Sequence, residues 1–574
     1  MNFFNIYLDK IKKTVIKNKK KLDIKDNQAL SKITVEVPPE KFNCDFSTNL
    51  CLILGKSINQ NPRILADKIK DILIDEINHF SSIEIAGPGF LNIKLSKDAW
   101  LYIINNIEKN KKTFGSNKNN NKYNIEFVSA NPTGPLHIGH CRGAIFGDVL
   151  SNLLKFNGNK VIKEFYVNDY GKQIEDFSKS IYFRLKEIKS KTNFPNDENL
   201  YPGEYIKEIS KKILKRQPNI NLQDFEKIKQ NLKKQGLKYS MDLIKSDLKD
   251  LGISHDIFFS ETNLVKQKSV EKVIKVLKKK NLIQDGYLQP PKGEDNTNWK
   301  KVKRLIFKSS LYGDDSDRAL TKNDNTWTYF ANDLAYHSNK VSRKYDFLIN
   351  ILGADHAGYI KRITAAVNAL SKNKNILICK VCQLVKLIKD GQPYKMSKRK
   401  GDFITIKDVL NEVGKDSLRF MMLSRGNDVE LDFDFNKVME KNKENPVFYV
   451  QYCYARINSL FRSLKINLNK EIKIDGKNFK PNTYEYKLLR KIIEWPRIMD
   501  IATNKLEPHR IPFYLYELST IFHSYWSEGN KNDDFKFISG GKINKKTSFK
   551  IFQLISIILE NGMFILGVSL PKKM

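Results

Sequence analysis

Residues Glu126 to Asp148 read EFVSANPTGPLHIGHCRGAIFGD, and this stretch decides the fold. The apolar residues Ile125 to Val128 predict a strand, and a helix-like segment follows a turn rich in proline and glycine. A strand, a glycine loop and a helix start point backbone N–H groups at a phosphate. Gly139 lies between two histidines and removes a side chain where a ligand would approach. The stretch therefore predicts a nucleotide site at the first turn of an α/β fold.

A second stretch, YKMSKRKGD from Tyr394 to Asp402, brings lysines to the same kind of ligand. It follows a strand-like run, Ile376 to Leu387, and a turn at Asp390 to Pro393. Lysines in a loop beside a nucleotide can neutralise its triphosphate, and imidazoles can stabilise charge that grows on phosphorus. A lone His-x-x-His or a lysine run is more often structural than catalytic, so only the two stretches together predict ATP binding.

The two stretches resemble the HIGH and KMSK motifs of class I aminoacyl-tRNA synthetases, at His137 to His140 and Lys395 to Lys398. The longer segment SANPTGPLHIGH, with Arg142 after it, is similar to the corresponding segment of the arginyl-tRNA synthetases of that class. The resemblance runs in order along the whole chain. It implies an ATP-dependent, AMP-forming arginine–tRNA ligase that forms arginyl-adenylate and transfers the arginyl group to the terminal ribose of tRNA(Arg), releasing diphosphate.

The same resemblance assigns roles to residues of the two motifs. The implied catalytic residues are His137, His140, Lys395 and Lys398. The implied ATP-binding residues are Pro132, Gly134, His137, Gly139, His140, Met396, Ser397 and Lys398. ATP implies Mg2+ in the substrate complex, although no dedicated carboxylate ligand is identifiable. We expect no tightly bound cofactor and no zinc.

Selection of arginine requires carboxylates, because a guanidinium presents parallel N–H donors that a carboxylate accepts in pairs. Asp333 follows Tyr329 by four residues and shares its face if the segment is helical, a spacing that is also typical of an ordinary surface pair. The resemblance places the pair in the site. The arginine-binding residues that it implies are Glu126, Asn131, Tyr329, Asp333 and His356.

Two further matches to the family are DDSDR, Asp314 to Arg318, and YVNDYGKQI, Tyr166 to Ile174. Turn chemistry explains both equally well, since Asp and Gly favour loop tips. Asn168 and Gln173 follow the HIGH segment closely enough to line the same cleft.

Length and pattern predict three domains. Residues 1–112 predict a small α+β domain whose AGPGFLNIKL wording is similar to the tRNA-contacting N-terminal domain of the family. Residues 122–430 alternate strand-like and helix-like segments, as in a Rossmann-like parallel-sheet catalytic domain, with the KMSK loop at 394–402. A lysine-rich helical insertion is expected at about 185–300, too short for a hydrolytic editing domain.

Residues 440–574 predict amphipathic helices of a bundle, similar to the anticodon-binding domain of the family. Aromatic residues on such helices are mostly core, but aromatic rings also stack on single-stranded bases. The anticodon candidates are Tyr452, Phe522, Trp526 and Met574, with Tyr454 and Tyr525 on the same segments.

The formal net charge of +36 indicates a polyanionic partner such as tRNA, although lysine is heavily used along the whole chain and part of the excess is background composition. No continuous apolar run reaches about eighteen residues, and the N-terminus lacks the apolar core of a secretory signal. We therefore expect a cytoplasmic monomer without a membrane span, an organellar transit peptide being the lesser alternative. Cys379 and Cys382 have C-x-x-C spacing, but no second pair completes a zinc site, and their segment predicts a buried strand.

Three alternatives are open to test. Another class I synthetase could carry the same motifs, but a cysteinyl enzyme should show zinc-ligand cysteines. A small-substrate adenylyltransferase would not need the N-terminal module or the helical tail. A non-catalytic RNA-binding paralogue should have lost histidines or lysines that both motifs retain here.

Overall fold

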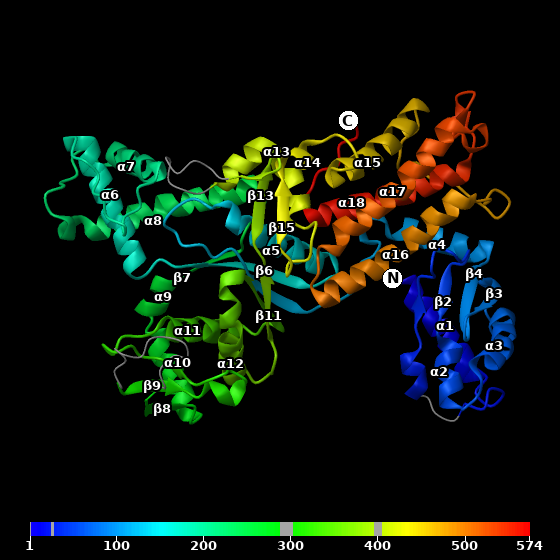
Figure 1. Ribbon diagram of the computed structural model, residues 1–574, viewed down its shortest axis with the longest axis horizontal. Helices are drawn as coiled ribbons and strands as arrows, with labels where there is room; N and C mark the ends of the chain where they lie inside the picture. Colours follow the sequence, from blue (N-terminus) through cyan, green and yellow to red (C-terminus); the bar gives the residue numbers. More distant parts are fainter. Residues whose placement is uncertain (1, 25–27, 288–301, 395–403) are drawn as a thin grey trace. The chain divides into compact units, whose positions relative to one another are not determined.

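The computed structural model describes residues 2–24, 28–287, 302–394 and 404–574. The chain forms two compact units, one made of Met1–Asn117 with Lys441–Met574 and the other of Lys118–Glu440 (Figure 1). The N-terminal and C-terminal segments thus share a unit, although the sequence predicts them as separate domains. The nucleotide fold occupies the second unit.

Five parallel strands form the main sheet of the second unit, in the order β12–β11–β5–β6–β7. They are β5 (Lys122–Glu126), β6 (Lys160–Val167), β7 (Ile257–Ser260), β11 (Phe347–Gly353) and β12 (Leu377–Cys382). Helix α5 (Ile138–Phe156) connects β5 to β6, and α12 (Ile360–Leu370) connects β11 to β12. Parallel strands end at one shared edge, which is where open α/β sheets bind ligands. This arrangement confirms the predicted parallel-sheet α/β class.

Helix α5 approaches the sheet closely because Gly147 faces Phe127. A Cβ atom on Gly147 would come within 2.3 Å of the Phe127 ring. The next residue, Asp148, accepts bonds from Lys163 and Arg419, each at 2.6 Å. Burial alone would raise the pKa of Asp148, but Arg419 and Lys163 hold it below its ordinary value. These contacts fix the helix that carries the HIGH residues.

The segment predicted as one insertion, about 185–300, is divided by a strand of the main sheet. The part before β7 contains α6 (Lys172–Ser190), α7 (Glu204–Arg216) and α8 (Phe225–Asp250), which enclose an apolar core of their own. The part after β7 contains α9 (Glu261–Lys266), α10 (Ser269–Lys279) and an antiparallel sheet of β8 (Ile283–Gly286), β9 (Arg304–Phe307) and β10 (Arg318–Ala319). The single-insertion prediction was wrong at β7, because four residues are too few for a strand period to stand out.

The rest of the second unit follows the antiparallel sheet of β8, β9 and β10. Helix α11 (Tyr329–Ser342) precedes β11, and the C-x-x-C cysteines lie on β12, as the strand prediction expected. The remaining elements are β13 (Val385–Lys389), β14 (Gln392–Pro393), α13 (Ile406–Met421), β15 (Leu431–Asp434) and α14 (Phe435–Met439).

The first unit combines an N-terminal α+β part with a helical bundle. The N-terminal elements are α1 (Phe3–Lys17), β1 (Val35–Glu36), β2 (Phe46–Thr48), α2 (Leu50–Ser57), α3 (Pro62–Glu76), β3 (Phe80–Ala86), β4 (Phe90–Leu95) and α4 (Lys97–Asn110). The bundle contains α15 (Pro446–Ser463), α16 (Thr483–Lys505), α17 (Arg510–Lys531) and α18 (Lys546–Leu566). The contacts that join these parts include an ion pair of Arg490 with Asp45 at 2.7 Å and a bond that Trp495 donates to the Phe114 carbonyl at 2.9 Å.

Helix α18 is long and apolar enough to cross a membrane by length and composition. Its sequence contains no uninterrupted apolar run of that length, because polar residues such as Gln553 and Ser556 divide it. In the structure, 83% of its most apolar stretch is buried among the other bundle helices. The bundle core therefore accounts for its composition.

Candidate active site

The loop between β5 and α5 has an unusual backbone at its first residues. Val128 and Ser129 have φ angles of +71° and +36°, a left-handed conformation that is rare for a β-branched residue. The Ser129 hydroxyl accepts the Tyr166 N–H at 3.0 Å and donates to Glu126 at 3.3 Å. Strained backbone held by such contacts is typical of functional sites. The turn brings the loop back onto the edge of the sheet.

The two histidines of the HIGH motif hold each other at the first turn of α5. Their ring centroids lie 3.9 Å apart. Nδ1 of His137 accepts the Gly139 N–H at 3.1 Å, and Nδ1 of His140 accepts the His137 N–H at 3.3 Å. Each ring therefore carries its proton on Nε2 when neutral. A Cβ atom on Gly139 would meet the His137 ring at 2.8 Å, so glycine is required beneath it.

Both imidazoles are neutral near pH 7. Burial lowers the pKa of His137, and burial together with His137 lowers the pKa of His140 to about 4. Two Nε2–H donors thus stand at the N-terminus of a 19-residue helix, whose dipole favours negative charge. This arrangement suits the oxygens of a phosphate.

The KMSK residues Lys395, Met396, Ser397 and Lys398 lie outside the described residues. The segment directly after them borders the HIGH motif. Ile138 donates its N–H to the Ile404 carbonyl at 3.0 Å, and Ile406 donates to the Leu136 carbonyl at 3.1 Å. The chain that leaves the second motif therefore lies beside the first.

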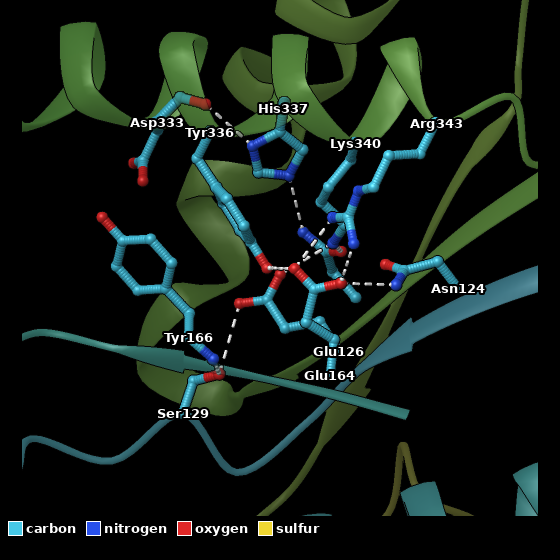
Figure 2. Close-up of polar contacts among 11 residues, drawn as sticks. Asn124, Glu126, Ser129, Glu164, Tyr166, Asp333, Tyr336, His337, Lys340 and Arg343 are labelled. Atoms are coloured by element: carbon cyan, nitrogen blue, oxygen red, sulfur yellow. Dashed lines mark hydrogen bonds and ion pairs between the residues drawn. The ribbon is translucent and has the colours of Figure 1, made fainter. Parts of the chain in front are cut away.

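One register row across the sheet carries three polar side chains and a cysteine. The row consists of Glu164 on β6, Glu126 on β5, Asn350 on β11 and Cys379 on β12. Figure 2 shows Glu126 and Glu164 facing side chains that descend from α11. Helix α11 and this row together form the polar floor of the candidate site.

A chain of hydrogen bonds runs along this floor. Lys340, whose side chain is 0% exposed, donates to Glu126 and to Asn350, both at 2.8 Å. Asn350 donates to Nε2 of His337 at 2.9 Å, and His337 donates from Nδ1 to the Asp333 carbonyl at 2.9 Å (Figure 2). Burial lowers the pKa of His337 to about 3, which keeps this tautomer neutral. The chain connects Glu126 to the backbone of Asp333.

Glu164 anchors the end of α11 to the sheet. Its two oxygens accept a fork from Arg343 at 2.7 and 2.9 Å. Tyr336 donates to the same carboxylate at 2.9 Å, and Asn124 donates at 2.7 Å (Figure 2). This fully buried carboxylate is satisfied by its partners, so its role is to hold α11 in place.

Asp333 and Glu261 are two further acidic groups of the site, Asp333 half-buried and Glu261 buried. Burial raises the pKa of each to about 7; Glu126 adds to the shift of Asp333, and Asp333 adds to that of Glu261. Tyr359 donates to Asp333, and Asn332 donates to Glu261 at 3.0 Å. Among the residues that the structure describes, neither carboxylate forms an ion pair with a lysine or arginine. Arg362 and Lys340 lower the pKa of Asp333 without pairing with it, so the two carboxylates favour a cationic ligand.

Glu261 and Tyr359 are site residues that the sequence did not predict. Glu261 directly follows β7, and an acid at the end of a parallel strand would have been a signal had that strand been recognised. Tyr359 belongs to the GADHAGY segment, in which only His356 was selected. His356 has a side chain that is 62% exposed and lies 3.4 Å from Asp355. Tyr359 is the residue of that segment that reaches Asp333.

Other predicted residues lie apart from the floor. Tyr329 is 80% exposed at the first residue of α11, with the Lys322 ammonium 5.5 Å from its ring centroid, and it is not among the contacts of Figure 2. Asn131 accepts a bond from Asn168 at 2.9 Å on the HIGH loop. Gln173 lies in the first turn of α6.

Two charged motif residues are structural. Arg318 forks onto Asp314 with two bonds of 2.7 Å, which fits the turn interpretation of DDSDR. Arg142 donates to three backbone carbonyls, those of Gln383, Gly426 and Val429, at 2.7 to 3.0 Å. It therefore ties α5 to the segments around β13 and β15.

The bundle carries an aromatic groove of about 360 Å3 in the first unit. Tyr452 lines this groove. The Phe448 ring stacks on the Tyr452 ring with 5.6 Å between centroids, and the Arg456 guanidinium lies 4.2 Å from the centroid of the Tyr452 ring. Trp526 is half-buried and also faces Arg456, at 5.5 Å.

Phe522, one of the anticodon candidates, is a core residue. It is 0% exposed, because it fills the bundle core against Phe552, and a base cannot reach its ring. Tyr454 and Tyr525 are buried as well. Met574, by contrast, is 55% exposed.

Three family models match the chain. The arginyl tRNA synthetase N terminal domain matches residues 7–95, the catalytic domain of class I (R) tRNA synthetases matches 103–460, and the DALR anticodon binding domain matches 450–574. The chain is 50% identical to an arginine–tRNA ligase of Pelagibacter ubique and 42% identical to one of Bartonella bacilliformis, each over 100% of both chains.

Solved structures agree on the fold. The arginyl-tRNA synthetase of Thermus thermophilus superposes with a TM-score of 0.70 at 16% identity, covering 99% of this chain and 100% of that one. The enzyme of Plasmodium falciparum gives a TM-score of 0.67 at 19% identity, covering 99% of each. Together with the full-length matches, the HIGH geometry and the parallel sheet, these findings lead to one assignment: the chain belongs to the arginyl-tRNA synthetase family of class I aminoacyl-tRNA synthetases.

Proposed function

We propose that this chain is an arginine–tRNA ligase that forms arginyl-adenylate from L-arginine and ATP and then charges tRNA(Arg). The observation that carries the amino-acid choice is the pair of Asp333, which is half-buried, and Glu261, which is buried; neither forms an ion pair with a lysine or arginine of the described residues. Neither alternative enzyme class nor a non-catalytic paralogue is favoured, because the family matches cover the full chain.

ATP binds at the start of α5 in this proposal. The Nε2–H groups of His137 and His140 donate to phosphate oxygens as negative charge develops during attack of the arginine carboxylate on the α-phosphorus. Lys395 and Lys398 neutralise the triphosphate, and Ser397 adds a hydroxyl. Mg2+ enters with ATP as part of the substrate; within the described residues no group of three or more His, Cys, Asp or Glu side chains could hold a metal.

Arginine binds over the polar floor in this proposal. Its guanidinium lies between Asp333 and Glu261, whose charges it neutralises through paired N–H donors. Glu126 is already paired with Lys340 and shapes the floor beneath the substrate. A lysine substrate would present a point charge and leave acceptor positions of the carboxylates unpaired.

The tRNA is the third substrate, and its terminal ribose hydroxyl attacks the adenylate carbonyl. We place the anticodon at the bundle groove, where Tyr452 and Trp526 offer rings next to Arg456 and Met574 lies at the exposed tail. The N-terminal part contacts the outer corner of the tRNA. We expect the enzyme to act as a cytoplasmic monomer.

Pyrophosphate exchange and aminoacylation assays over the twenty amino acids, with and without tRNA(Arg), test the proposal. Charging should depend on arginine alone, with lysine as the most informative competitor. Charging of another amino acid, or tRNA binding without adenylate formation, would replace this function by one of the alternatives.

A further inference from the structure

Asp247 in the last turn of α8 holds the backbone directly before the HIGH motif. One of its carboxylate oxygens accepts the Leu136 N–H at 2.8 Å. The carbonyl of the same leucine accepts the Ile406 N–H at 3.1 Å. Both backbone groups of the residue that precedes His137 are therefore bound, one by the helical insertion and the other by the segment that leads into α13. Asp247 is only 7% exposed, so water does not replace this contact.

The end of α8 is itself fixed relative to α5. Buried Arg419 donates to the Leu251 carbonyl at 2.9 Å and to Asp148 of α5 at 2.6 Å. Leu251 caps α8, one turn after Asp247. Arg419 therefore holds the end of α8, which carries Asp247, in place relative to α5, the helix that follows the loop.

Two tyrosines of the same insertion touch the loop just upstream. The Thr133 side chain lies beside the Tyr201 hydroxyl and offsets part of the rise that burial gives the pKa of this tyrosine. The Tyr205 ring covers Gly134 so closely that a Cβ atom there would come within 3.1 Å of it. The segment 133–136 is thus contacted by the insertion at three points, before the loop reaches the histidines.

We propose that Asp247, supported by Tyr201 and Tyr205, is a positioning residue for ATP. By holding residues 133–136, the insertion sets where the His137 imidazole and the N-terminus of α5 meet the phosphates. The inference rests on the proposed function, because it assigns the triphosphate to this loop. Displacement of a catalytic group by about 1 Å can cost roughly a hundredfold in rate.

Asp247→Ala removes the acceptor, whereas Asp247→Asn keeps an amide oxygen that can accept the same N–H. We expect the alanine variant to raise the KM for ATP or lower kcat by about tenfold or more in aminoacylation, with the KM for arginine within about twofold of the parent. The asparagine variant should restore most of the activity. Asp250→Ala, an exposed acid on the same helix, is the matched control and should behave like the parent.

ATP affinity measured by calorimetry separates this inference from the function itself. Failure of the parent chain to charge arginine would overturn the proposed function, whereas an ATP affinity and a kcat in Asp247→Ala that both equal those of the parent would overturn the positioning role. Equal damage to ATP and arginine parameters, or an asparagine variant as impaired as alanine, would also overturn it. If Asp247→Ala does not fold, Tyr201→Phe decides, since it removes only the hydroxyl beside Thr133; an unchanged KM for ATP and an unchanged kcat in that variant would refute the inference.

Discussion

At the scale of single residues, Asp333 and Glu261 make the site sensitive to protons. Burial raises the pKa of both carboxyls to about 7, so they carry protons below neutrality and charge above it. The arginine guanidinium is stabilised only by the charged form. We therefore predict that the KM for arginine rises as pH falls from about 8 to 6. The measurement is a pH series of steady-state kinetics, with Glu261→Gln flattening the response; an arginine KM independent of pH would contradict it.

Asp333→Asn should weaken arginine binding selectively. A neutral amide cannot match the charge of the guanidinium, and losing one partner of a desolvated charged pair costs roughly 2 to 5 kcal/mol. Arginine and ATP titrations in pyrophosphate exchange measure the effect. Asp315→Asn, at an exposed acid that pairs with Lys361, is the control and should change neither parameter. Equal losses for the two substrates would remove Asp333 from the arginine pocket.

The residue scale also shows where sequence reasoning reaches its limit. The HIGH motif predicted a nucleotide site because its histidines, glycines and turn are contiguous. Lys340 and Glu261 are missing from the prediction because each contributes through a contact across the sheet. Phe522 and Tyr454 were misjudged for the opposite reason, since an aromatic residue on a helix does not reveal which face the bundle covers.

At the scale of elements, α11 depends on the fork between Arg343 and Glu164. Arg343→Met would leave the Glu164 carboxylate buried without its cation, which typically costs about 3 to 5 kcal/mol. We expect a lower urea midpoint for unfolding of the nucleotide fold, followed by far-ultraviolet circular dichroism. Arg343→Lys, which retains charge but loses the fork, should lie between variant and parent. A midpoint unchanged in both variants would mean that packing alone holds α11.

Elements with strong periodicity were predicted well, and short ones were not. The bundle helices and the strand run that contains β12 were predicted from the apolar pattern, whereas the strand predicted at Ile125 to Val128 overlaps only the end of β5. Strand β7 has only four residues, all half-buried, and its role as an edge of the main sheet follows from pairing with β6 rather than from local sequence. The same pairing divides the expected insertion into two.

At the scale of the whole molecule, the last residues lie against the first helix of the bundle. Gln451 donates to the Ser569 carbonyl at 3.0 Å, and Arg462 donates to that of Lys572 at 2.7 Å. Deleting residues 570–574 should raise the KM for tRNA and reduce discrimination between anticodon variants, because the exposed tail with Met574, which we propose to contact the anticodon, would be lost. Charging of wild-type and anticodon-substituted tRNA(Arg) measures this. An unchanged charging ratio in a folded, truncated enzyme would refute it, and ATP affinity serves as the control.

The shared unit of the two ends of the chain has a consequence for synthesis on the ribosome. Residues up to Asn117 emerge first, yet Phe114 meets Trp495, and Glu108 meets the buried ammonium of Lys550, only after the last segment is made. The intervening Lys118–Glu440 takes roughly 15 to 65 s to translate at about 5 to 20 residues per second. Throughout that interval the N-terminal surface stands uncovered and open to chaperones, and a product released early, at Glu440, would keep it uncovered for good.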